Sequence, residues 1–87
     1  MKKSDKPRSD CRFKIRKDLD SYIAFFQMKG VITLNEIAAY ILSQIDGKNS
    51  IQDITRLVKK QFPEIKYPYQ EVVDLVKNLC EAGYLIL

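Results

Sequence analysis

The spacing of apolar residues changes once along this chain, near residue 33. Before that point, apolar side chains alternate with polar ones or gather in a short aromatic run, as they do in β-strands. After it, they recur every third or fourth residue, as in helices that bury one face. Strands and helices segregated in this way favour a small sheet packed against helices. We therefore expect an α+β fold, a three-stranded antiparallel sheet followed by three helices, in a winged-helix-like arrangement.

Three strands are expected before the change in spacing. Residues 11–16 alternate cleanly, residues 22–28 are apolar on both faces and should form the central strand, and residues 31–33 form a short third strand. Lys29-Gly30 supplies a two-residue hairpin signal between the last two strands. The outward face of the first strand consists of basic residues: Arg12, Lys14 and Arg16. The pattern predicts a meander whose edges are the first and third strands.

The first helix is expected to begin at Leu34. Thr33 and Glu36 have the spacing of a capping box, in which each side chain accepts a hydrogen bond from the backbone N–H of the other residue. Gly47 can take the left-handed conformation that commonly ends a helix. The sequence therefore predicts Thr33 as the N-cap and Gly47 as the stop of this helix.

Two further helices are predicted in the rest of the chain. The second begins after Ser50 and ends before Pro63, because proline clashes with a continuing helix. The third runs from Pro68, which is well suited to a first helical turn, to about Ala82. Residues 84–87 are too apolar to stay in water, so we expect them to pack back on the core.

The residue inventory lacks the groups that most catalytic chemistry needs. The 87 residues include no His and no Trp, and the two cysteines, Cys11 and Cys80, stand far apart in sequence. Imidazole catalysis and structural zinc sites both need residues that are missing here. We therefore expect no enzyme activity, no metal, no cofactor and two reduced thiols. No apolar run approaches the ~18 residues of a membrane helix, so we expect a cytoplasmic protein without a membrane partner.

Positive charge is concentrated at the start of the chain. Residues 1–17 hold eight Lys or Arg against two Asp, a charge of +6, so that with a net charge of +4 the remaining residues carry −2. A short basic segment of this kind is typical of a solvated terminus. We therefore expect residues 1–10 to form a basic disordered tail and residues 11–87 to form a single domain.

One set of residues resembles a known family. It comprises Leu34-Asn35-Glu36-Ile37-Ala38, Ile41-Leu42, Asp46-Gly47, Ile51 and Ile54. This pattern resembles the pyrroloquinoline quinone biosynthesis protein D (PqqD) family over about residues 12–85. It is also similar to the wider class of recognition elements for the precursors of ribosomally made, post-translationally modified peptides (RiPPs).

The resemblance implies a fold, a function and partners in natural product biosynthesis. The fold is three strands followed by three helices, and the function is that of a non-catalytic peptide chaperone. The leader segment of a precursor peptide binds as an added strand beside strand three, in a groove with helix three. The chaperone then presents the precursor to a maturation enzyme: a radical iron–sulfur maturase, a leader peptidase or a cyclase.

The residues themselves favour the same place for a peptide. The third strand contains no charged residue and no proline, which would hinder pairing at a sheet edge, so an extended peptide could pair with it. The apolar arc of the third helix is wider than burial against one core requires. The expected peptide-binding residues are Val31, Ile32, Thr33, Leu34, Val72, Val73, Val76, Lys77 and Cys80. The competing interpretations are that residues 84–87 cover the strand edge and that the helix residues complete a closed core.

Two other functions remain open from the sequence. A winged-helix DNA-binding regulator would fit the architecture, although the third helix exposes Glu71, Asp74 and Glu81, which phosphates repel. A general adaptor or dimerisation module is the other alternative. An open edge at strand three also allows a weak homodimer when no peptide is bound.

Overall fold

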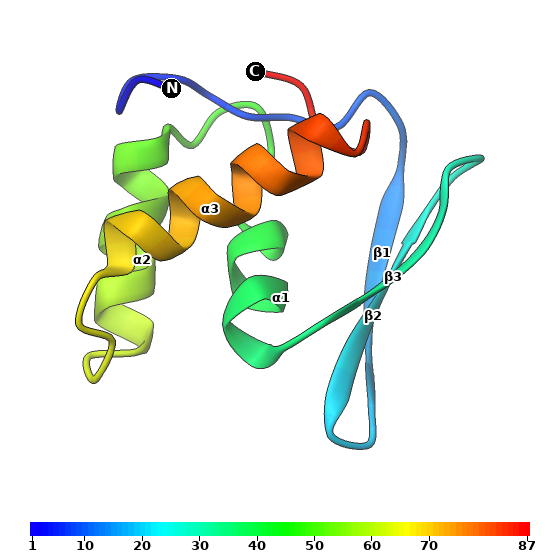
Figure 1. The fold of residues 1–87 in the computed structure, drawn as a ribbon, viewed down its shortest axis with the longest axis horizontal. Coiled ribbons are helices and arrows are strands. Elements are labelled where there is room, and N and C mark those ends of the chain that lie inside the picture. The colour runs from blue at the N-terminus through cyan, green and yellow to red at the C-terminus, as the bar shows by residue number, and fades with distance from the viewer.

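The computed structural model describes residues 1–87 and contains a three-stranded antiparallel sheet followed by three helices, as predicted (Figure 1). The elements are β1 (Phe13–Asp18), β2 (Ser21–Phe26), β3 (Gly30–Leu34), α1 (Glu36–Ser43), α2 (Ile51–Gln61) and α3 (Pro68–Glu81). All three helices lie on one side of the sheet (Figure 1). Helix α1 is central, because it packs on β2 and β3 on one side and on α2 and α3 on the other.

The strands form a meander in the order β1-β2-β3, with Phe13 opposite Phe26 and Tyr22 opposite Leu34. Strand β1 begins at Phe13 and continues to Asp18, so it lies two residues later than the predicted strand 11–16. The side chains of Ala24 and Phe26 point into the core, which leaves Phe25 between them on the opposite face. The sheet therefore has one face that covers the core and one that the helices leave open.

The hairpin between β2 and β3 differs from the predicted two-residue turn. Gly30 already pairs with Phe26, so the loop consists of Gln27–Lys29 rather than Lys29-Gly30. The N–H of Lys29 donates to the carbonyl of Phe26 at 3.1 Å. Met28 and Gly30 both take positive φ, 63° and 107°. The loop thus places the non-glycine residue Met28, as well as Gly30, in the region of positive φ that favours glycine.

The predicted N-cap of α1 is wrong: the cap is Asn35, not Thr33. The Oδ1 atom of Asn35 accepts a hydrogen bond from the N–H of Ala38 at 2.8 Å. Thr33 instead pairs with Ile23, because β3 continues through Leu34. A residue held in the sheet cannot also place its hydroxyl over the first turn of the helix, so the chain leaves the strand before it caps α1.

Helix α1 is also shorter than predicted, since it ends at Ser43. Gly47, the predicted stop, lies in the following loop with φ 79°. Its N–H donates to the carbonyl of Pro7 at 3.1 Å, and a Cβ there would lie 3.3 Å from the Cβ of Arg8. Gly47 therefore allows close approach of the N-terminal segment, which local sequence does not reveal.

The predicted starts of α2 and α3 are confirmed. Ser50 and Asp53 form a capping box, in which each backbone N–H donates to the side chain of the other residue at 3.1 and 3.0 Å. Helix α2 ends at Gln61, two residues before Pro63. Pro68 occupies the first turn of α3, where its missing N–H costs no hydrogen bond.

The core consists of buried apolar side chains from the sheet and all three helices. The largest fully buried side chains include Ile41, Leu42, Ile51, Ile54, Val58, Val72 and Val76. At one end of the sheet the ring of Phe26 stacks on Phe13 at 5.2 Å and contacts Tyr84 at 4.7 Å. None of the helices has the length and apolar character that crossing a membrane requires.

Both ends of the chain pack against the domain. Leu85 is 4% exposed, which confirms that the apolar C-terminal residues return to the core. Arg8 and Ile86 form a two-residue antiparallel bridge with hydrogen bonds of 2.9 and 2.7 Å. Pro7 is buried, and the carbonyl of Asp5 accepts from the first N–H of α2 at 2.8 Å. These contacts involve backbone groups of residues 5–8 and the buried ring of Pro7. That residues 1–10 form a disordered tail stays a prediction.

Candidate functional site

Strand β3 is an edge strand whose outer side has no partner. Its neighbour in the sheet is β2, and the C-terminal residues pair with Arg8 at another place instead of covering β3. In an antiparallel strand, alternate residues direct their N–H and C=O groups away from the existing partner. The outer side of Gly30–Leu34 can therefore accept one more strand.

Lys29 ties the start of β3 to the C-terminal end of α3. Its Nζ atom donates to the carbonyl oxygen of Gly83 at 2.8 Å and to Oδ1 of Asp10 at 2.5 Å. The hydrogen bond from Lys29 lowers the pKa of Asp10 below its ordinary value. The β2–β3 hairpin is thus fixed against the turn that follows α3.

A hollow of about 190 Å³ lies at the other end of β3, between α1 and α3. It is lined by Asn35, Ile37, Ala38, Ile41, Glu71, Asp74, Leu75 and Asn78. Asn35 directly follows β3, so the hollow adjoins the end of the free strand edge. Between these two ends α3 packs mainly on α1 and α2, not on β3. We call the outer side of β3 together with this hollow the edge site.

The predicted residues of β3 are divided between the two faces of the sheet. Val31 is 56% exposed and Thr33 is exposed beside it on the face away from the helices. Ile32 is half-buried and Leu34 is 8% exposed, both on the face toward the core. A strand added here would therefore place its side chains alternately beside Val31 and Thr33 and beside Ile32 and Leu34.

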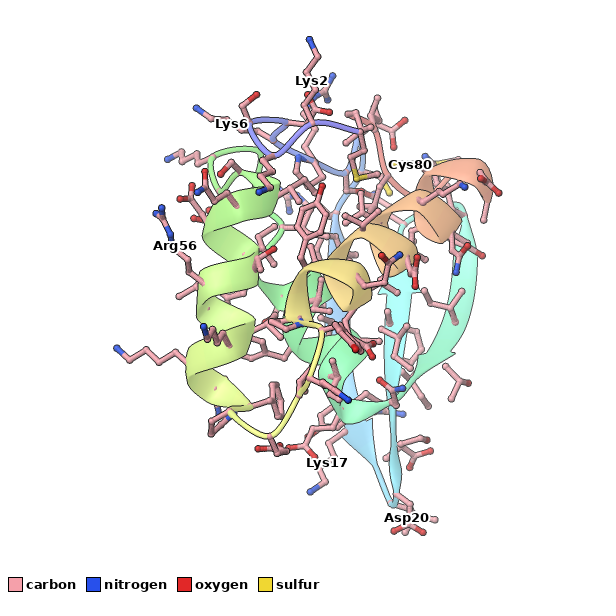
Figure 2. All side chains as sticks on the ribbon, turned by 60° about the vertical axis from the view of Figure 1, so that its left-hand side comes forward. Lys2, Lys6, Lys17, Asp20, Arg56 and Cys80 are labelled. Atoms are coloured by element: carbon pink, nitrogen blue, oxygen red, sulfur yellow. The ribbon has the colours of Figure 1, made fainter.

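The predicted residues of α3 lie away from the hollow. Val72 and Val76 are fully buried in the core. Val73 follows Tyr69 by one helical turn, on the flank where Nζ of Lys3 lies 5.5 Å from the Tyr69 ring. Cys80 lies two turns further on, at the end of the molecule where Lys2 and Lys6 also lie (Figure 2).

Sequence reasoning missed the residues of α3 that line the hollow, which lie on the opposite flank: Glu71, Asp74, Leu75 and Asn78. Periodicity gives the width of an apolar arc but not which of its flanks faces the sheet. Leu75 is the residue at the edge of that arc, and it is half-buried.

The hollow and the sheet differ in charge. Glu71 and Asp74 form no ion pair within the chain, and Oδ1 of Asp74 accepts only a hydrogen bond from Gln70, at 2.7 Å. The outward side of β1 is basic.

Burial raises the pKa of the Cys80 thiol, which keeps it protonated and weakly nucleophilic at neutral pH. The Cys, Asp and Glu side chains form no cluster of three that could hold a metal ion.

Comparison with known proteins assigns the chain to a family. The family model described as "Coenzyme PQQ synthesis protein D (PqqD)" matches residues 18–85, which include all of β2 to α3. The chain belongs to the PqqD family. No solved structure matches it.

Three relatives of this PqqD-family chain are each named "PqqA binding protein". The relative from Acinetobacter baylyi is 36% identical over 76 residues, 87% of this chain and 76% of its own length. The relative from Azotobacter vinelandii is 32% identical over 59 residues, 68% of this chain and 64% of its own length. The relative from Klebsiella pneumoniae is 30% identical over 57 residues, 66% of this chain and 62% of its own length. The chain thus spans about three quarters of the first relative and less than two thirds of the other two.

Proposed function

We propose that this PqqD-family protein binds the leader segment of a ribosomally made precursor peptide as a fourth strand beside β3. The observation that supports this most directly is the free outer side of β3 at the edge of the sheet. The names of the relatives, which describe proteins that bind PqqA, support a peptide as the ligand. No charge or proline in β3 blocks the approach of a second backbone.

Strand addition explains how a site without conspicuous chemistry can bind a peptide. Backbone hydrogen bonds to β3 supply the affinity, and pockets for alternate side chains supply the specificity. Leader side chains that point toward the helices reach Ile32 and the hollow beside Leu75. The exposed carboxylates of Glu71 and Asp74 at this hollow favour a basic residue in the leader there.

The protein acts by tethering and performs no reaction itself. Binding of the leader at the edge site holds the rest of the precursor close to the enzyme that modifies it. The gain is an effective concentration, which reaches the millimolar range for short flexible connections. The enzyme is a radical iron–sulfur maturase, a leader peptidase or a cyclase.

A backbone N-methyl scan of the leader tests strand addition without changing the protein. The probe is the leader segment of PqqA, the ligand in the names of the relatives, synthesised with single N-methyl groups at successive positions. Each methyl group on an N–H that points to β3 removes one hydrogen bond, worth about 1 kcal/mol or roughly a fivefold loss of affinity. We expect calorimetry to show losses at every second position of the bound segment.

The spacing of the affinity losses along the leader distinguishes the possible modes of binding. A period of two residues supports strand addition. Losses at every position, losses with a period of three to four residues, or no binding of the unmodified leader all contradict it, because a helix or an irregular peptide does not alternate in this way.

A further inference from the structure

The outer face of the sheet, the face turned away from the helices, lies open to solvent (Figure 1). Two adjacent rows of the strand register define it: Lys14, Phe25 and Val31, then Arg16, Ile23 and Thr33. Each row thus begins with a cation on β1, continues with an apolar residue on β2 and ends on the free edge strand β3. Charge and apolar surface are therefore ordered across the face in the same sequence in both rows.

Large apolar side chains are exposed on this face to an unusual degree. Phe25 is 39% exposed, Val31 is 56% exposed, and Met28 at the tip of the adjacent hairpin is 99% exposed. Phe25 and Val31 are neighbours in the strand register, and exposed apolar side chains grouped in this way typically mark an interaction site. The Phe25 ring also lies 5.4 Å from the Arg16 guanidinium, so the apolar and basic parts of the face are in contact.

The basic residues of the face have no acidic partner within the chain. Arg12, Lys14 and Arg16 are exposed and form no ion pair. A hollow of about 220 Å³ lies between β1 and β2 and is lined by Arg12, Lys14, Phe25 and Gln27, together with Phe13 and Phe26. Two cations beside an aromatic ring complement carboxylates carried next to apolar side chains.

We propose that the outer face is the docking surface for the enzyme that modifies the precursor, which contacts it through acidic and aliphatic side chains. This inference rests on the proposed function. It also follows from continuity, because Val31 and Thr33 belong to the edge strand as well as to the outer face. A leader added beside β3 extends this face by one strand, so the enzyme contacts protein and leader together and binds more tightly when the leader is present.

A protein fits this face better than a nucleic acid does. Single-stranded nucleic acids stack successive bases on a series of aromatic rings. Phe25 is the one aromatic residue among the two rows of the face, and Ile23, Val31 and Met28 offer no flat surface for a base. Aliphatic side chains of this kind pack instead against apolar side chains of another protein.

Charge reversal on the outer face tests the proposal. The probe is the purified enzyme that modifies the precursor, and its affinity for this protein is measured by calorimetry with and without leader. We expect Lys14→Glu/Arg16→Glu to lower the affinity for the enzyme at least tenfold. The affinity for the leader should fall less than twofold, because β2 and β3 separate β1 from the leader. The matched control is Lys59→Glu/Lys60→Glu, which makes the same charge change at exposed positions of α2, and it should bind both ligands as wild type. Phe25→Thr tests the apolar part and should also weaken enzyme binding alone.

The outcomes separate the two proposals. If wild type does not bind leader, the proposed function fails. If leader binds and the enzyme does not bind, or binds Lys14→Glu/Arg16→Glu as tightly as wild type, the docking surface is overturned. The same conclusion follows if both double variants lose enzyme affinity equally, since the effect is then one of net charge. Loss of self-association or of RNA binding in the outer-face variant, with enzyme affinity unchanged, reassigns the face to a second copy or to RNA.

Discussion

Leu75 and Val73 lie two residues apart on α3 but on opposite flanks of the helix, and replacing each with alanine tests which flank contacts the leader. Leu75 lines the hollow beside the end of β3, whereas Val73 lies on the flank of Tyr69. Both side chains are half-buried. The two substitutions are therefore similar in their effect on the core and differ in their position relative to the edge site.

The expected magnitude follows from the surface that the leader covers. Full burial of a leucine side chain is worth about 1.5–3 kcal/mol, and about half of that remains to be gained at half-buried Leu75. Leu75→Ala should thus weaken leader binding by about 1 kcal/mol, roughly fivefold. Val73→Ala should bind leader as wild type. Each variant loses about 1 kcal/mol of stability or less, which lowers the melting temperature by roughly 4–8 °C and leaves the protein folded at 25 °C.

Calorimetric titration of the two variants with the leader peptide, together with thermal melts, gives the answer. Unchanged leader affinity in Leu75→Ala would falsify the assignment of the hollow to the edge site. A loss confined to Val73→Ala places the peptide on the flank that includes Cys80, as the sequence alone predicted. Equal losses in both variants indicate that α3 acts on binding only through its stability.

Three further predictions concern the fold that supports the site. Asn35→Ala should cost about 1 kcal/mol in thermal denaturation because it removes the cap of α1, and a larger loss in Thr33→Ala would contradict this assignment. The N–H of Ser50 lowers the pKa of Asp53, so the stabilising effect of this carboxylate is present above the ordinary pKa of about 4 and lost as pH falls through the lowered value. The melting temperature should therefore fall more steeply with decreasing pH in wild type than in Asp53→Asn. Parallel plots of melting temperature against pH would refute this. Deletion of residues 1–8 removes buried Pro7 and its neighbouring backbone hydrogen bonds and should lower the melting temperature by roughly 5 °C or more; an unchanged melt would show that this segment is a disordered tail.

The order of the elements could be predicted from the sequence because local patterns determine them. Alternation in the first strand, Ser50 before α2 and proline at the start of α3 act over a few residues, and each appears in the structure, although β1 lies two residues later than predicted. The uncharged β3 edge was predicted in the same way, since the absence of charge and proline is visible in the residues themselves. What the sequence determined is thus the set of elements and one side of the edge site.

Contacts between distant segments were decided only by the tertiary structure. The flank of α3 that faces the end of β3 depends on how the helix is rotated on α1, so the hollow beside Leu75 has no local signal. The cap of α1 is Asn35 and not the predicted Thr33, because pairing with Ile23 holds Thr33 in β3. Local propensity cannot anticipate either result, because each is set by hydrogen bonds and packing across the sheet and the helices, and these override the weaker preferences of single residues.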